Sequence, residues 1–70
     1  MNIKTGKYRH FKGNIYQVIC VARNSETLEE MVVYQDVDNR EKIWVRPLTI
    51  WNEEIVLGGK TIKRFTYIGE

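Results

Sequence analysis

The chain has 70 residues, a single cysteine and a formal net charge of +2. Folding at this length buries only about 60% of the chain's surface, so we expect one β-barrel domain over residues 1–70, with shallow sites rather than a deep enzyme cleft. The low net charge excludes a bulk attraction to polyanions. Without an apolar run of the kind found in signal peptides or membrane spans, the chain is expected to be cytoplasmic, with no membrane contact.

The first third of the chain predicts two strands joined by a tight turn. Residues 8–11 have the pattern of a short strand, and residues 12–14 that of a turn in which Gly13 supplies a positive φ. Residues 15–22 are apolar at almost every position, which indicates a strand that is covered on both faces or bends through a barrel wall. Cys20 lies between Ile19 and Val21, so we expect a buried and inert thiol.

Residues 31–48 form a self-consistent β-hairpin if residues 38–40 are the loop. A polar loop over residues 23–30, in which Asn24 or Ser25 could cap one helical turn, precedes it. The hairpin register places three favourable pairs opposite each other, namely Val33 with Val45, Tyr34 with Trp44, and Asp36 with Lys42. It separates an apolar face of Met31, Val33, Val37, Ile43 and Val45 from an aromatic and charged face of Tyr34, Asp36, Lys42, Trp44 and Arg46. We expect function on the second face.

The last third predicts a second hairpin. Pro47 should end the preceding strand, because proline cannot donate a ladder hydrogen bond. Residues 48–53 are either extended or a short helical turn, capped by Thr49, that tucks Ile50 or Trp51 under the barrel. Gly58-Gly59 is a strong turn signal, and its register pairs Ile55 with Ile62, Glu54 with Lys63, and Glu53 with Arg64. A final strand is expected over residues 61–68.

These elements predict an all-β fold of five to six short antiparallel strands. Open edges are a liability in so small a sheet, which favours closure. We therefore expect a small SH3-like barrel or roll, with an OB-like barrel as the alternative.

Several motifs follow one another along the chain: Gly6-x-Tyr8-x-His10-Phe11-Lys12-Gly13, Tyr16, Ala22-x-x-Ser25-Glu26-Thr27, Val32-Val33-Tyr34, Trp44-Val45-Arg46-Pro47 and Arg64-Phe65. In this order they resemble a small bacterial family known as domain of unknown function 1653. The resemblance covers nearly the whole chain and implies no activity, ligand or catalytic residue. The chain departs from the family at Trp51, where a phenylalanine is expected, and this change keeps an aromatic ring.

The residues give little support to an enzyme. Catalysis by a nucleophile would need Cys20 or Ser25 within hydrogen-bond reach of His10, the only histidine, and an apolar-flanked cysteine is far more often a core residue. Ligand spacings typical of a zinc site are absent, as is a glycine-rich phosphate loop. We therefore expect no enzymatic activity, no metal and no cofactor.

Three interpretations of the surface remain open. We favour a binding module in which Tyr34, Trp44 and Arg46 hold a protein or peptide, with the rings as anchors and the guanidinium on a carboxylate. The alternative is binding of RNA or single-stranded DNA, in which paired terminal strands merge basic residues into one face, chiefly Lys7, Arg9, Lys12, Lys63 and Arg64. In the third, Tyr34 and Trp44 are core residues and Arg46 pairs with Glu26 or Glu29.

Overall fold

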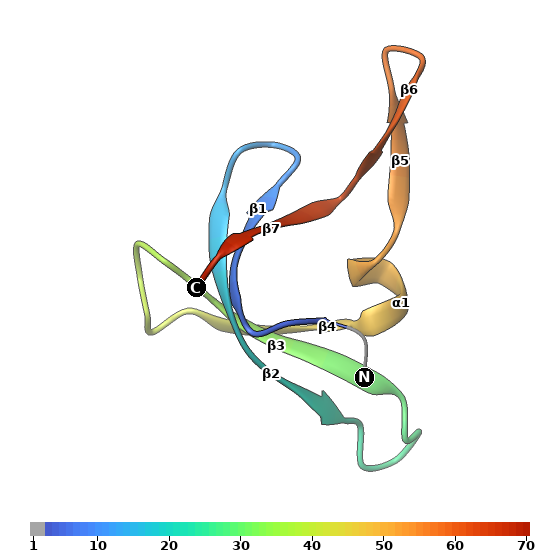
Figure 1. Ribbon diagram of the computed structural model, residues 1–70. Coiled ribbons are helices and arrows are strands. Elements are labelled where there is room, and N and C mark those ends of the chain that lie inside the picture. Colours follow the sequence, from blue (N-terminus) through green and yellow to red (C-terminus); the bar gives the residue numbers. More distant parts are fainter. Residues whose placement is uncertain (1–2) are drawn as a thin grey trace.

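A computed structural model describes residues 3–70 of the chain. The described chain is all β, with seven strands and one helical turn (Figure 1). The elements are β1 (Gly6–His10), β2 (Ile15–Arg23), β3 (Glu30–Asp36), β4 (Ile43–Pro47), α1 (Leu48–Trp51), β5 (Glu54–Leu57), β6 (Lys60–Lys63) and β7 (Phe65–Gly69).

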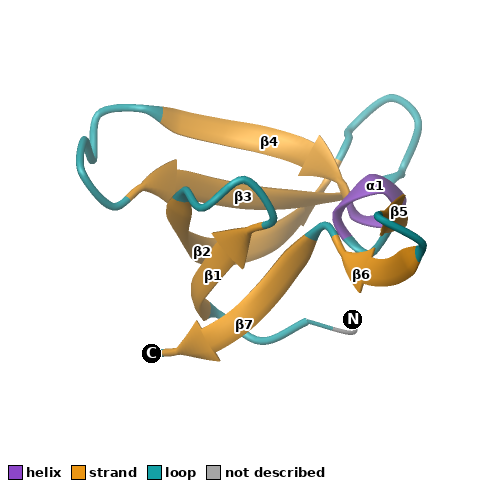
Figure 2. Cartoon of the chain, turned by 90° about the horizontal axis from the view of Figure 1, so that it is seen from above, coloured by secondary structure: helices purple, strands orange, loops and turns teal. Residues whose placement is uncertain are grey.

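Five strands form one antiparallel sheet in the order β4-β3-β2-β1-β7, while β5 and β6 form a separate hairpin. The sheet is strongly twisted and coiled, with α1 near the end of β4 (Figure 2). The expected all-β fold is thus confirmed, as a roll that is open between its edge strands β4 and β7. The predicted final strand over residues 61–68 is divided at Arg64 into β6 and β7, which raises the strand number. The loop between β3 and β4 carries no helix, so the OB-like alternative gains no support.

Both predicted hairpin registers are confirmed. Val33 lies opposite Val45 and Tyr34 opposite Trp44, and the Asp36 amide donates to the Lys42 carbonyl at 3.1 Å. In the second hairpin the pairs are Glu54 with Lys63 and Ile55 with Ile62. The turn after β1 also forms as expected, with Gly13 at φ +104°.

The terminal strands pair as well, because β1 lies against β7. Gly6 permits this approach: a Cβ atom there would lie 2.8 Å from the carbonyl oxygen of Gly69, and the φ of Gly6 is +134°. A larger residue would push the two strands apart.

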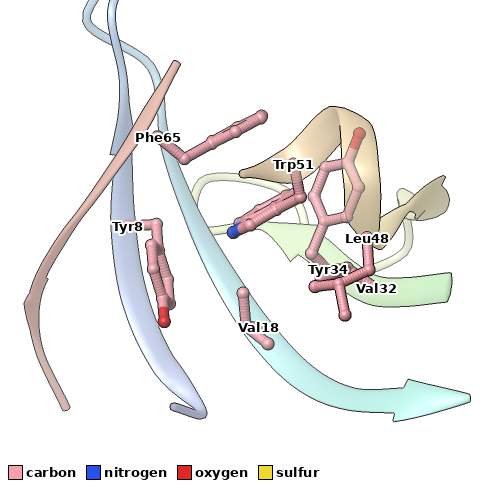
Figure 3. Close-up of a cluster of buried hydrophobic side chains, with 7 residues drawn as sticks. All are labelled: Tyr8, Val18, Val32, Tyr34, Leu48, Trp51 and Phe65. Carbon is pink, nitrogen blue, oxygen red and sulfur yellow. The ribbon is translucent and has the colours of Figure 1, made fainter. Parts of the chain in front are cut away.

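The core lies on the concave side of the roll and is largely aromatic (Figure 3). Its buried residues are Tyr8, Val18, Val32, Tyr34, Leu48, Trp51 and Phe65. The even-numbered face of β3 therefore points inward. The apolar face predicted for this hairpin points outward instead, with Val45 61% and Ile43 56% exposed. The sheet is a single layer, and only its concave side is covered.

Cys20 is exposed, so the prediction of a buried thiol was wrong. The register between β2 and β3 shifts between Val18 and Cys20, where a bulge inserts Ile19. Cys20 then pairs with Val33 on the outward face, whereas Val18 is buried. A bulge of this kind bends the strand, which explains how so apolar a segment forms the wall of a roll.

Residues 48–51 form the short helical turn that was one of two predicted alternatives. Its start is Pro47, without a side-chain cap, so the expected cap at Thr49 was wrong. Leu48 and Trp51, three residues apart, share one side of the turn and are both buried, whereas Ile50 is 38% exposed. The turn thus closes one end of the roll with Trp51. It is far too short to span a membrane, and no other helix occurs in residues 3–70.

Candidate functional site

The floor of the candidate site is the aromatic core itself. The rings of Trp51 and Phe65 stack with centroids 3.7 Å apart and an angle of 3° between their planes (Figure 3). Tyr34 lies 4.9 Å from Trp51, and Tyr16 packs edge-on against Tyr34 at 5.2 Å. These rings come from β2, β3, β7 and α1. The side chains of His10 and Arg46 pack on this group of rings at Phe65.

Basic side chains converge on this floor around His10. The His10 ring packs edge-on against Phe65 at 4.9 Å and lies 4.4 Å from the ring of Phe11. The Arg46 guanidinium carbon lies 5.6 Å from the centroid of Phe65, so a side chain of edge strand β4 reaches the opposite edge strand β7. Cations over aromatic rings are stabilised by the ring quadrupole.

Two further basic side chains lie near the ring of Phe11. The Lys12 ammonium lies 5.8 Å from its centroid, and the Arg64 guanidinium carbon 5.9 Å. We call the set of His10, Lys12, Arg46 and Arg64 on Phe11 and Phe65 the cationic cluster. It lies where the roll is open between β4 and β7.

The electrostatics of His10 report this convergence. Partial burial of the ring lowers the pKa of His10 below its usual value of 6.5, and the positive charges of Arg46, Arg64 and Lys12 lower it further. Its Nδ1 accepts a hydrogen bond from the Lys12 amide at 3.2 Å. A neutral imidazole is therefore favoured near neutral pH, with the basic side chains of Lys12, Arg46 and Arg64 around it.

The predicted site residues Tyr34, Trp44 and Arg46 do share one face of the β3–β4 hairpin, but their exposure differs. Tyr34 is only 5% exposed and is part of the core. Its hydroxyl accepts a hydrogen bond from Arg46 Nε at 3.3 Å, so Tyr34 positions the guanidinium rather than meeting a partner. Trp44 is 48% exposed, and its indole N–H donates to Asp36 Oδ1 at 2.9 Å.

Within residues 3–70, the ion pair found is between Arg64 and Glu53, at 2.6 Å. The third interpretation was therefore wrong in its ion pair between Arg46 and Glu26 or Glu29. It was right that Tyr34 is core, but wrong for Trp44, which is 48% exposed. Arg64 Nε is buried without a hydrogen-bond partner in the described chain. The predicted facing of Glu53 and Arg64 is confirmed.

The basic residues proposed for a nucleic-acid face do not form one surface. Lys7 and Arg9 alternate with the buried Gly6 and Tyr8 along β1, so they point away from the concave side. Lys12 and Arg64 belong to the cationic cluster. Lys63 lines a separate pocket beside Trp51 and Tyr67.

The candidate catalytic residues are also dispersed. Cys20 lies on the outward face of β2, while His10 packs on the concave aromatic floor. Ser25 belongs to the loop between β2 and β3, where Asn24 Oδ1 accepts hydrogen bonds from the amides of Glu26 and Thr27. The described residues contain no cluster of three potential metal ligands.

The sequence did not point to the cationic cluster as a unit. Its members lie far apart, on the β1–β2 turn, on β4 and beside β7, and they meet only because β7 pairs with β1 and the roll closes toward β4. One local pattern did point to it. In two places a basic residue is adjacent to a phenylalanine in the sequence, namely Phe11-Lys12 and Arg64-Phe65.

Two comparisons with known proteins relate this chain to one family. Residues 6–67 match the family model described as "Protein of unknown function (DUF1653)". The chain is similar to a protein of the same family from Bordetella bronchiseptica whose crystal structure is known, with 38% identity and a TM-score of 0.88. The alignment covers 97% of this chain and 90% of that chain. No curated protein matches the sequence.

Proposed function

The chain belongs to the DUF1653 family, and from its cationic cluster we propose that it is a non-enzymatic binding module that recognises acidic side chains of a protein or peptide partner. One observation carries the proposal: Lys12, Arg46 and Arg64 converge on His10 over a shared aromatic floor. Clustered cations on a fixed apolar base are suited to charge-assisted hydrogen bonds with carboxylates.

Arg46 is the central donor of this proposed site. A guanidinium carries five N–H donors, and Tyr34 takes the one on Nε. The terminal amino groups are left for a carboxylate, which they can hold in a bidentate pair. The half-exposed ring of Trp44, fixed by Asp36, adds an apolar contact beside it.

Neighbouring carboxylates favour a peptide over a nucleic-acid backbone at the cluster. Lys12 also lines a hollow of about 490 Å³ that is lined by Asp36 and Asp38 as well. These acids would repel phosphates that pass Lys12, whereas the carboxylates of a flexible peptide can reach Arg46 and Arg64, which do not line this hollow. The placement of His10 and the exposed Cys20 on opposite faces of the sheet supports binding rather than thiol catalysis.

Titration with a hexaglutamate peptide, followed by the tryptophan fluorescence of the protein, tests the proposal. Arg46→Gln should weaken binding by about tenfold, since a hydrogen bond to a charged group contributes roughly 1.5–3 kcal/mol. Arg9→Gln is the matched control, because Arg9 is an exposed arginine on the other face, and it should bind as the unchanged protein does. Equal losses in the two variants would indicate non-specific attraction and overturn the proposal.

A uridylate hexamer of similar charge provides the second arm of the experiment. We expect it to compete poorly with hexaglutamate at the cationic cluster. Displacement of the peptide by the hexamer, with loss of hexamer binding in Arg46→Gln, would replace the proposal with the nucleic-acid alternative.

A further inference from the structure

A second pocket is bordered by the Trp51–Phe65 stack, and none of the four basic side chains of the cationic cluster lines it. It has a volume of about 430 Å³ and is lined chiefly by Tyr8, Trp51, Phe65 and Tyr67, with Lys4 and Lys63 at its rim. This volume falls in the range of small-molecule sites, which are mostly apolar with a few placed polar groups. Among residues 3–70, no carboxylate side chain lines it.

The pocket contains a buried donor without an acceptor. Trp51 is 2% exposed, and its indole N–H has no hydrogen-bond partner within residues 3–70. The indole nitrogen lies on the side of the ring toward Tyr8 (Figure 3). A buried polar group that lacks a partner destabilises the folded protein, so natural proteins rarely leave one unsatisfied. The donor therefore marks where an acceptor atom of a ligand belongs.

An exposed ring and two cations complete the pocket. Tyr67 is 37% exposed, and the Lys4 ammonium lies over its ring at 5.3 Å from the centroid. A flat ligand could replace the flexible Lys4 side chain on this ring face, which would free the ammonium to pair with an anion. Lys63 offers a second positive charge at the rim.

We propose that this pocket binds a nucleotide, with a carbonyl oxygen of the base accepting from Trp51 Nε1, the base stacked on Tyr67, and the phosphate held by Lys4 and Lys63. A stacking ring, a buried donor and two cations together match a flat heterocycle that carries an acceptor and an attached anion. This inference does not rest on the proposed function, because Arg46 and the other cationic side chains of the cluster take no part in it.

The indole N–H signals in a ¹H–¹⁵N NMR spectrum test the proposal directly. The two tryptophans give two signals, and that of Trp44, already bonded to Asp36, is an internal control. Uridine 5′-monophosphate should shift the Trp51 signal downfield and leave the Trp44 signal in place. No shift at millimolar nucleotide, or a shift produced equally by inorganic phosphate alone, would overturn the proposal.

Variants separate the contacts. Tyr67→Ala should weaken binding of the nucleotide by about tenfold and Tyr67→Phe should restore it, because stacking needs the ring and not the hydroxyl. Lys63→Gln should weaken binding by about fivefold, whereas Lys7→Gln, on the outward face, and Arg46→Gln, in the cationic cluster, should not. Equal losses in Lys63→Gln and Lys7→Gln would show that no rim cation is specific, and would contradict the proposal.

A uridylate pentamer distinguishes a nucleotide within a single strand from a free nucleotide as the natural ligand. If the natural ligand is a nucleotide within a single strand, the pentamer should shift the Trp51 signal at a lower concentration than the monophosphate does. If it is a free nucleotide, the monophosphate should be at least as effective. A pentamer that binds without moving the Trp51 signal would show that nucleic acid uses another surface, and would overturn the proposal.

Discussion

At the scale of single residues, Trp51 has the largest expected effect on stability. It is 2% exposed, stacks on Phe65 and contacts Tyr34, so Trp51→Ala should destabilise the fold by about 3–5 kcal/mol. Ile50→Ala is the matched control from the same helical turn, and because Ile50 is 38% exposed it should cost less than about 1 kcal/mol. Urea unfolding midpoints measure both. Similar losses would show that Trp51 is not the centre of the core.

Cys20 gives a second prediction at this scale. Because its side chain is exposed on the outward face of β2, a thiol reagent should label the native protein at a rate close to that of the protein unfolded in urea. The measurement is the release of thionitrobenzoate with and without denaturant. Labelling that is slowed a hundredfold in the native protein would mean that another surface covers Cys20.

At the scale of elements, the β5–β6 hairpin is expected to be the least stable part of the fold. It projects away from the sheet (Figure 1), and its strands pair only with each other. Val56 is 73% and Leu57 51% exposed. At its base, the Arg64 amide donates to the Glu53 carbonyl and the two side chains form the ion pair. An isolated two-stranded hairpin is marginally stable, so the contacts at its base matter most.

Native-state hydrogen exchange measures this difference. Amides paired between β5 and β6 should exchange much faster than those paired between β2 and β3, which lie in the middle of the sheet. Glu53→Gln should speed exchange in the hairpin further and leave β2–β3 unchanged. Equal protection of the β5–β6 and β2–β3 amides would show that the β5–β6 hairpin is as stable as the sheet.

At the scale of the whole molecule, local pairing was predictable and the inward face was not. Cross-strand pairs such as Tyr34 with Trp44 and Ile55 with Ile62 constrain each register, and turn glycines mark the loops. The choice of inward face depends on what covers the sheet. Since Trp51 and other rings cover only one side, Val45 stays exposed although it is apolar.

The part of the candidate site that depends on local strand geometry was predictable, and the part that depends on the closure of the roll was not. Trp44 and Arg46 could be assigned to one face because that assignment needs only strand alternation. The meeting of Arg46 with Phe65 and of Arg64 with Phe11 depends on how far the roll closes between its edge strands, and no local pattern encodes that distance. Burial of Tyr34 likewise follows from the position of α1.

The single histidine lies within the cationic cluster, so its titration reports directly on the proposed binding of carboxylates there. In the free protein, the ¹H NMR titration of His10 should give a pKa below 6.5, because burial and the three surrounding cations disfavour protonation. Saturation with hexaglutamate should raise this pKa, since carboxylates on Arg46 and Arg64 offset the positive charge around the ring. In Arg46→Gln the free pKa should already be higher, and the peptide should raise it less. A His10 pKa that is the same with and without bound peptide would contradict carboxylate binding at the cluster.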